Sequence, residues 1–162
     1  LYSLPDVFDE QFPNRANAFQ FDTDTRNIFI CADSKRLLSA FLELLSNAAE
    51  ADNSCGSIQI HSHVNACGHT VTVSVTGKGS LSEINPSEMQ TNPLIDADAP
   101  LTAQLSTPFF STKENHAGLG LSIVAQVCHT HHAGFELYSR NGFTTAGITF
   151  PILAMDDMRN TI

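Results

Sequence analysis

The chain has 162 residues, which is enough for one domain with a hydrophobic core and too few for two. Its composition, 42% hydrophobic and 15% charged, is typical of a folded globular protein and excludes a disordered chain. The formal net charge of -9 argues against nucleic acid or an anionic membrane as a partner. A polyanionic ligand would therefore need locally placed cations or Mg²⁺ to offset the overall charge.

The cysteines and the hydropathy pattern indicate the compartment. The four cysteines, Cys31, Cys55, Cys67 and Cys128, show no short paired spacing, which favours reduced thiols and a cytoplasmic location. No signal peptide or apolar run of membrane length is present in the sequence. The chain starts at Leu1 without a methionine, so we expect a longer parent protein in which any membrane contact lies upstream.

The first third of the chain predicts an arm, a strand pair and a long helix. Residues 1–15 contain two prolines and predict a turn-rich arm or connector. Short apolar runs at 19–21 and 28–31 predict a pair of strands. Asp33 is a suitable N-cap for a helix that extends to about residue 52. The core face of this helix recurs at helical spacing, at Leu37, Phe41, Leu44 or Leu45, and Ala48.

The remaining elements complete one domain. Residues 57–64 and 70–75 alternate as strands do, around a turn at 65–69. Residues 80–107 contain three prolines and weak periodicity, as expected of a functional or mobile loop. A second helix is expected from Gly120 to about His131, followed by strands near 134–139 and 147–153 and a polar tail at 155–162. This order predicts an α+β domain with helices on one face of a mixed, mostly antiparallel sheet.

Two polar residues of the first long helix are candidates for chemistry. Glu43 and Asn47 are four residues apart and therefore share a helix face. An amide oxygen at Asn47 suits Mg²⁺ that bridges to phosphates, and a carboxylate at Glu43 can orient or deprotonate a nucleophile. On spacing alone, an ordinary solvated helix face is the more common explanation of such a pair.

The segment 107–124, TPFFSTKENHAGLGLSIV, predicts a phosphate-binding turn. Gly118 and Gly120 would let backbone N–H groups approach an anion. The helix that follows would direct its positive N-terminal end to the same place.

Five segments together resemble the GHKL ATPase family, and most closely its sensor histidine kinases of the nitrogen-regulation type. ELLSNAAEA at 43–51 resembles the N box, PFFSTK the F box, and HAGLGLSIV the second glycine box. His132-Ala133-Gly134 resembles the His-Gly-Gly after that helix, and GITFP at 147–151 the terminal strand. The resemblance covers about residues 22–153 and implies the Bergerat fold, a two-layer α/β sandwich.

The resemblance also implies a function and roles for individual residues. The chain would be the ATP-binding catalytic domain of a two-component sensor kinase, passing the γ-phosphoryl group to a histidine on a separate dimerisation domain, with a response regulator downstream. Asn47 would be the Mg²⁺ ligand and Glu43 the catalytic residue. The phosphates would lie near Thr112 and Lys113 and in a backbone nest at Gly118, Leu119 and Gly120. The chain has no phosphoacceptor segment of its own, so we do not expect it to phosphorylate itself.

The implied division of the chain is an arm at 1–21, the ATP-binding domain at 22–154 and a tail at 155–162. A lid over the nucleotide would occupy about 80–107. This lid contains no Lys or Arg, which leaves Lys78 and Lys113 at its two ends as the nearby cations.

The first glycine box departs from the family pattern. The family has an aspartate that accepts a hydrogen bond from the adenine amino group, whereas the corresponding segment here is Val75-Thr76-Gly77-Lys78-Gly79. Strand alternation places Val75 on the buried face, where the aspartate would point, and Thr76 on the other. An unpaired amino group in the pocket would cost about 1–3 kcal/mol of binding.

This departure leaves other functions open at the level of sequence. A degenerate, pseudokinase-like domain would bind ATP weakly or not at all and act through protein–protein contacts. An anti-sigma-type serine kinase shares the fold, but the GLGLSIV wording favours a histidine kinase.

The histidines predict structural roles. His61, His63, Cys67 and His69 do not have the spacing of a standard zinc finger. The histidines at 129, 131 and 132 are placed to complement the C-terminal dipole of the second helix.

Overall fold

The computed structural model describes residues 4–11, 18–23, 28–51, 57–79, 81, 104–106 and 118–153. In chain order the elements are α1 (Leu4–Gln11), β1 (Ala18–Thr23), α2 (Ser34–Ala51), β2 (Ser57–Val64), β3 (Thr70–Lys78), α5 (Gly120–Thr130), β4 (Gly134–Arg140) and β5 (Phe143–Pro151). None of the helices among these residues is long and apolar enough to cross a bilayer.

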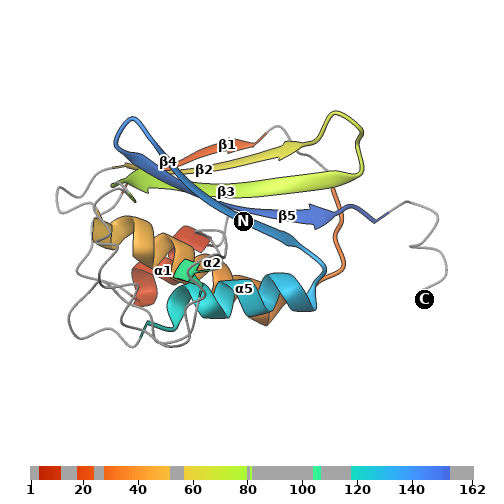
Figure 1. The fold of residues 1–162 in the computed structure, drawn as a ribbon, viewed down its shortest axis with the longest axis horizontal. Helices are drawn as coiled ribbons and strands as arrows, with labels where there is room; N and C mark the ends of the chain where they lie inside the picture. Colours follow the sequence, from red (N-terminus) through yellow and green to blue (C-terminus); the bar gives the residue numbers. More distant parts are fainter. Residues whose placement is uncertain are drawn as a thin grey trace.

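The five strands form one sheet in the order β1-β2-β3-β5-β4. Strands β1 and β2 run parallel, and the other three neighbouring pairs are antiparallel. Helices α1, α2 and α5 all lie on one side of the sheet, below it in Figure 1. The fold is therefore the two-layer α+β arrangement that the order of elements predicts.

One hydrophobic core fills the space between the two layers. The helix-facing side chains of the sheet alternate along each strand, as Ile58 and Ile60 do on β2. Phe41, Leu44 and Leu45 of α2 pack against the same core, as their spacing predicts. The helix starts where expected, because Oδ1 of Asp33 accepts hydrogen bonds from the N–H groups of Lys35 and Arg36 at 3.0 and 3.1 Å.

The hairpins follow their turn residues. In the predicted turn at 65–69, Oδ1 of Asn65 accepts from the N–H groups of His69 and Thr70 at 3.0 and 3.3 Å. Asn141 and Gly142 both have positive φ, 55° and 78°, which is the geometry of a two-residue hairpin turn. Because this turn is so short, β5 starts at Phe143 and not near residue 147 as predicted.

The N-terminal segment differs from its prediction. The sequence indicated a turn-rich arm, but Leu4–Gln11 is helical, because a proline in the first helical turn sacrifices no intrahelical hydrogen bond. Phe8 is fully buried, and its ring lies 5.5 Å from that of Phe19, edge to face. Burial of this one aromatic ring attaches α1 to the core.

The strand predicted at residues 28–31 is also wrong. Residues 28–33 have no strand assignment, and β1 pairs instead with β2. Instead, the carbonyl oxygen of Phe29 accepts a hydrogen bond from the backbone N–H of Leu153. Ile28 and Phe29 are exposed, so no alternating buried face holds the stretch in a ladder. The tail at 155–162 and most of the predicted lid lie outside the described residues, and the division at 21/22 and 154/155 stays a prediction.

Candidate functional site

The two polar residues of α2 meet the first residue of α5. Helices α2 and α5 pack side by side beneath the sheet (Figure 1). A Cβ built on Gly120 would lie 2.7 Å from Oε2 of Glu43 and 3.7 Å from Nδ2 of Asn47. Only a residue without a side chain fits here while Glu43 keeps its position. The structure thus brings three of the sequence-predicted site residues together.

The turn before α5 presents backbone rather than side chains. Gly118 has φ of 66°, a left-handed conformation that glycine adopts without strain. Leu119 occupies the N-cap position, and its side chain makes no capping hydrogen bond. The first N–H groups of a helix have no partner within the helix, so they can bind an anion. The start of α5 is therefore a backbone site beside the Glu43 carboxylate and the Asn47 amide.

The glycines of β3 bring the sheet close to the same helix. A Cβ on Gly77 would lie 2.8 Å from Cβ and 3.2 Å from the carbonyl oxygen of Ala48, the residue after Asn47. Gly79 has φ of 145°, and a Cβ there would lie 3.0 Å from Cβ of Ala51. These glycines thus serve close packing of β3 on α2, next to the site.

Val75 has the orientation that strand alternation predicts. Its side chain is 2% exposed and belongs to the hydrophobic core, with Val71 and Val73 on the same face. Thr76 points to the other face, where its Oγ1 lies 2.8 Å from Oγ1 of Thr145. Neither residue offers an oxygen on the helix side of the sheet. These two side chains therefore supply no acceptor there for an adenine amino group.

Mg²⁺ and nucleotide phosphates suit the residues at this site. The Asn47 amide can provide a neutral oxygen ligand, and the 118–120 backbone can provide N–H donors. Because Gly120 has no side chain, its backbone lies next to the Glu43 carboxylate, where a Cβ would clash. Lys78 is exposed at the end of β3. Thr112 and Lys113 lie outside the described residues.

A separate hollow lies on the other side of the sheet. A pocket of about 480 Å³ lies on the outer face of the sheet and includes Gln59, His61, Ser74 and Thr76 in its lining. These side chains alternate with the core residues of β2 and β3, so the pocket lies across the sheet from α2 and α5. It is separate from the glycine-lined site.

The described histidines make contacts on the outer face of the sheet and at the end of α5. Across the residues with described positions, no group of three His, Cys, Asp or Glu side chains could hold a metal ion. His61 lies 3.8 Å from the Asp22 carboxylate on the outer face. At the end of α5, Nδ1 of His131 binds the Val127 carbonyl oxygen at 2.7 Å. The sequence analysis missed the second bond of His131, to the backbone N–H of Asp33 at 2.9 Å.

The His-Gly-Gly motif of the resemblance fits the structure better when its histidine is His131 and not His132. His132, taken as the histidine of that motif, has φ of 52°, a conformation that favours glycine. His131 precedes this left-handed residue and makes the side-chain contacts. A left-handed residue directly after a helix is the signal that would have located the motif.

Comparison with known proteins gives the family. Residues 32–154 match the family described as histidine kinase-, DNA gyrase B-, and HSP90-like ATPase. The sensory histidine kinase/phosphatase NtrB of Rhizobium leguminosarum bv. phaseoli is 33% identical over 127 residues, which are 75% of this chain and 32% of that protein. The NtrB of Rhodobacter capsulatus is 28% identical over 120 residues, 74% of this chain and 33% of its own length. The chain thus spans about a third of the curated relatives it matches.

The fold agrees with solved kinase domains. The catalytic domain of histidine kinase ThkA, solved without nucleotide, has a TM-score of 0.69 and 26% identity, covering 93% of this chain and 88% of that one. These relatives are sensor kinases, which supports the kinase interpretation over the degenerate one. With the glycine turn set against Glu43 and Asn47, the chain belongs to the histidine kinase-, DNA gyrase B- and HSP90-like ATPase family, as a domain of the sensor histidine kinase type.

Proposed function

We propose that this chain binds Mg-ATP between α2 and the 118–120 turn and transfers the γ-phosphoryl group to a histidine on a separate dimerisation domain. The observation that carries the proposal is the contact of Gly120 with Glu43 and Asn47. It places a carboxylate, an amide and the backbone at the start of a helix around one point.

Each group has a defined task in this proposal. Asn47 holds the metal through its amide oxygen, and the backbone of residues 118–120 donates to the phosphates. When bound, Mg²⁺ offsets the negative charge that develops on the phosphate oxygens. Glu43 accepts the N–H of the incoming imidazole and turns its other nitrogen toward phosphorus. A nitrogen–phosphorus bond then forms as the bond to the leaving β-phosphate oxygen breaks.

The partners follow from the same family. The phosphorylated histidine of the dimerisation domain passes its phosphoryl group to a response regulator. Support comes from a solved complex of ThkA with the response regulator TrrA, whose kinase is 25% identical to this chain with a TM-score of 0.67. We propose that the parent protein is a sensor kinase of which this chain is the cytoplasmic catalytic part.

We expect Val75 to lower the affinity for ATP without changing the chemistry of phosphoryl transfer. No oxygen from β3 pairs with the adenine amino group, so binding is expected to be about tenfold to a hundredfold weaker than with an aspartate. Phosphate and metal contacts then contribute the larger share of the affinity.

Isothermal titration with Mg-ATP tests binding. We expect a dissociation constant in the range of about 10 µM to 1 mM, with binding lost when EDTA removes the metal. Asn47→Ala should weaken binding at least about tenfold, since it removes the metal ligand. Ser39→Ala, at an exposed position of the same helix, is the matched control and should bind as the unaltered chain does. No heat of binding at millimolar Mg-ATP would rule the proposal out.

Phosphotransfer in trans tests the chemistry. The chain, γ-labelled ATP and a separately produced dimerisation domain should yield an acid-labile phosphohistidine. Glu43→Gln should reduce the rate by about a hundredfold or more with little change in Mg-ATP affinity. An unchanged rate in Glu43→Gln would remove this residue from the mechanism and leave the binding result intact.

A further inference from the structure

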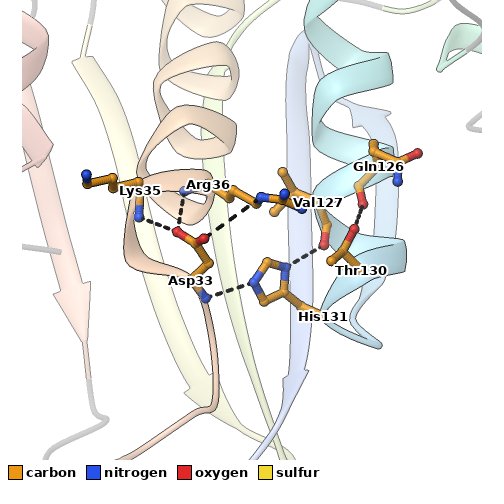
Figure 2. A network of polar contacts seen from close by, with 7 residues as sticks. All are labelled: Asp33, Lys35, Arg36, Gln126, Val127, Thr130 and His131. Carbon is orange, nitrogen blue, oxygen red and sulfur yellow. Dashed lines mark hydrogen bonds and ion pairs between the residues drawn. The ribbon is translucent and has the colours of Figure 1, made fainter.

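His131 joins two elements that are distant in the sequence. It follows the last residue of α5, and its Nε2 accepts a hydrogen bond from the backbone N–H of Asp33 at 2.9 Å, across 98 positions. Its Nδ1 lies 2.7 Å from the carbonyl oxygen of Val127. Figure 2 shows the imidazole between the ends of the two helices, with Asp33 on one side and Val127 on the other. Asp33 is also the residue whose carboxylate caps α2.

The two contacts determine the protonation state of the ring. A backbone N–H can only donate, so Nε2 must carry a lone pair. A carbonyl oxygen can only accept, so Nδ1 must carry the proton. His131 therefore makes both bonds only as the neutral Nδ1–H tautomer. A second proton on Nε2 would face the N–H of Asp33 and abolish that bond.

The Asp33–His131 hydrogen bond lies at the C-terminal end of α5, and the glycine-lined site lies at its N-terminal end. From Gly120 to His131, α5 advances about 16 Å, and from Asp33 to Glu43, α2 advances about 15 Å. The start of α2 meets the end of α5, and Glu43 meets Gly120, so the two helices run antiparallel with matching lengths between the two contacts. A shift of one helix along the other at His131 would move the 118–120 turn past Glu43 and Asn47.

We propose that His131 is a positioning residue that fixes the register of α5 against α2, and with it the 118–120 turn against Glu43 and Asn47. The functional part of this inference rests on the proposed nucleotide site. The register itself is a property of the chain and can be tested without nucleotide.

Charged groups around the ring come from both helices. At the start of α2 these are the Asp33 carboxylate and Arg36, with Nε of Arg36 3.9 Å from Oδ2 of Asp33, whereas the Lys35 side chain points away from the ring (Figure 2). On its own helix end they are His129 and His132, both exposed. The backbone donor contacts Nε2 directly, so the register contact requires the lone pair of that nitrogen.

Three variants separate the two bonds. In His131→Gln the amide oxygen can take the place of Nε2 and accept from the Asp33 N–H. His131→Asn can replace only the donor to Val127, and His131→Leu replaces neither. His129→Gln, an exposed histidine in the last turn of the same helix, is the matched control.

Nuclear magnetic resonance on the isotope-labelled chain without nucleotide provides the test. The ¹⁵N shifts of the ring should report the Nδ1–H tautomer at pH 8. The Asp33 amide should exchange at least about tenfold faster in His131→Asn and His131→Leu, and the amide resonances of residues 118–120 should move with it. His131→Gln should retain the pattern of the unaltered chain, because its amide oxygen can still accept from the Asp33 N–H.

The result that would overturn the inference is equally specific. If His131→Leu folds and leaves the resonances of residues 118–120 in place, or if the ring carries its proton on Nε2, His131 does not set the register. Mg-ATP titration of the same variants is read separately. Weaker binding in the Leu variant, restored by Gln, is expected, and no binding by any form would refute the nucleotide proposal while the resonances still decide the register.

Discussion

Gly120 lies against the Glu43 carboxylate so closely that a Cβ would sit 2.7 Å from Oε2. The contact joins the start of α5, in the proposed phosphate turn, to the proposed catalytic side chain in the middle of α2. Its physical consequence is that a change at the glycine acts first on the orientation of Glu43.

Gly120→Ala should therefore reduce activity without harming the fold. The carboxylate is the end of a flexible side chain and can move aside, and alanine is a better helix former than glycine. We expect the free energy of unfolding to change by less than about 1 kcal/mol and phosphotransfer to fall at least about tenfold. Gly134→Ala is the control, since a Cβ there would meet Thr149 at an ordinary 3.8 Å. Equal activity of both variants would contradict a role for the Gly120–Glu43 contact.

Gly77→Ala should destabilise the domain itself. Here the new Cβ meets Cβ, Cα and the carbonyl oxygen of Ala48 within 3.2 Å, and most of these atoms are backbone. Strand and helix must move apart, which typically costs about 1–3 kcal/mol. Chemical denaturation measures the loss. In the double variant with Ala48→Gly the nearest clash is removed, so the two losses should be less than additive; strict additivity would show that packing at this point is loose.

Val75→Asp should change stability and nucleotide binding in opposite directions. A carboxylate at a position only 2% exposed destabilises the nucleotide-free domain by a few kcal/mol. The same carboxylate can accept from an adenine amino group, so the thermal shift produced by Mg-ATP should increase. Val73→Asp has a similar cost of burial on the same face without that contact. If both aspartates respond to Mg-ATP alike, the gain does not come from adenine recognition.

Stability should fall in acid through Asp33. The N–H groups of Arg36 and Lys35 that bind its carboxylate lower its pKa below the ordinary value, with Arg36 the larger cause. A lowered pKa in the folded state means that the contribution is present at neutral pH and is lost as the pH falls below about 4. Thermal denaturation between pH 7 and pH 3 should therefore show a smaller decrease for Asp33→Asn than for the unaltered chain. Asparagine retains the cap but cannot titrate, so an identical decrease in both would exclude Asp33 as a cause.

The described cysteines should differ in reactivity. Burial raises the pKa of the Cys128 thiol to about 11, and its side chain is 3% exposed. Its thiolate is scarce at pH 8, whereas Cys31 and Cys67 are exposed. Brief iodoacetamide treatment followed by peptide mass mapping should label Cys31 and Cys67 and spare Cys128. Cys128 should become labelled when the chain is unfolded in urea. Rapid labelling of Cys128 in the native chain would instead show that α5 opens.

Local pattern was sufficient for much of the fold. The Asp33 cap and the buried face of α2 follow from residue type and helical period, which act within a few residues along the chain. The burial of Val75 and the outward direction of Thr76 follow from the two-residue period of a strand. The order of the glycine and N-box motifs likewise indicated the family that comparison then established.

The tertiary structure decided what is brought together. Parallel pairing of β1 with β2 and the attachment of α1 through Phe8 depend on surfaces that only the assembled core provides. Sequence placed Glu43 and Gly120 in one site by resemblance, and packing of α5 on α2 determined their separation. The bond from Asp33 to His131 had no signal in either local segment, because a hydrogen bond across 98 positions depends on the relative placement of two helices and not on the propensities of either.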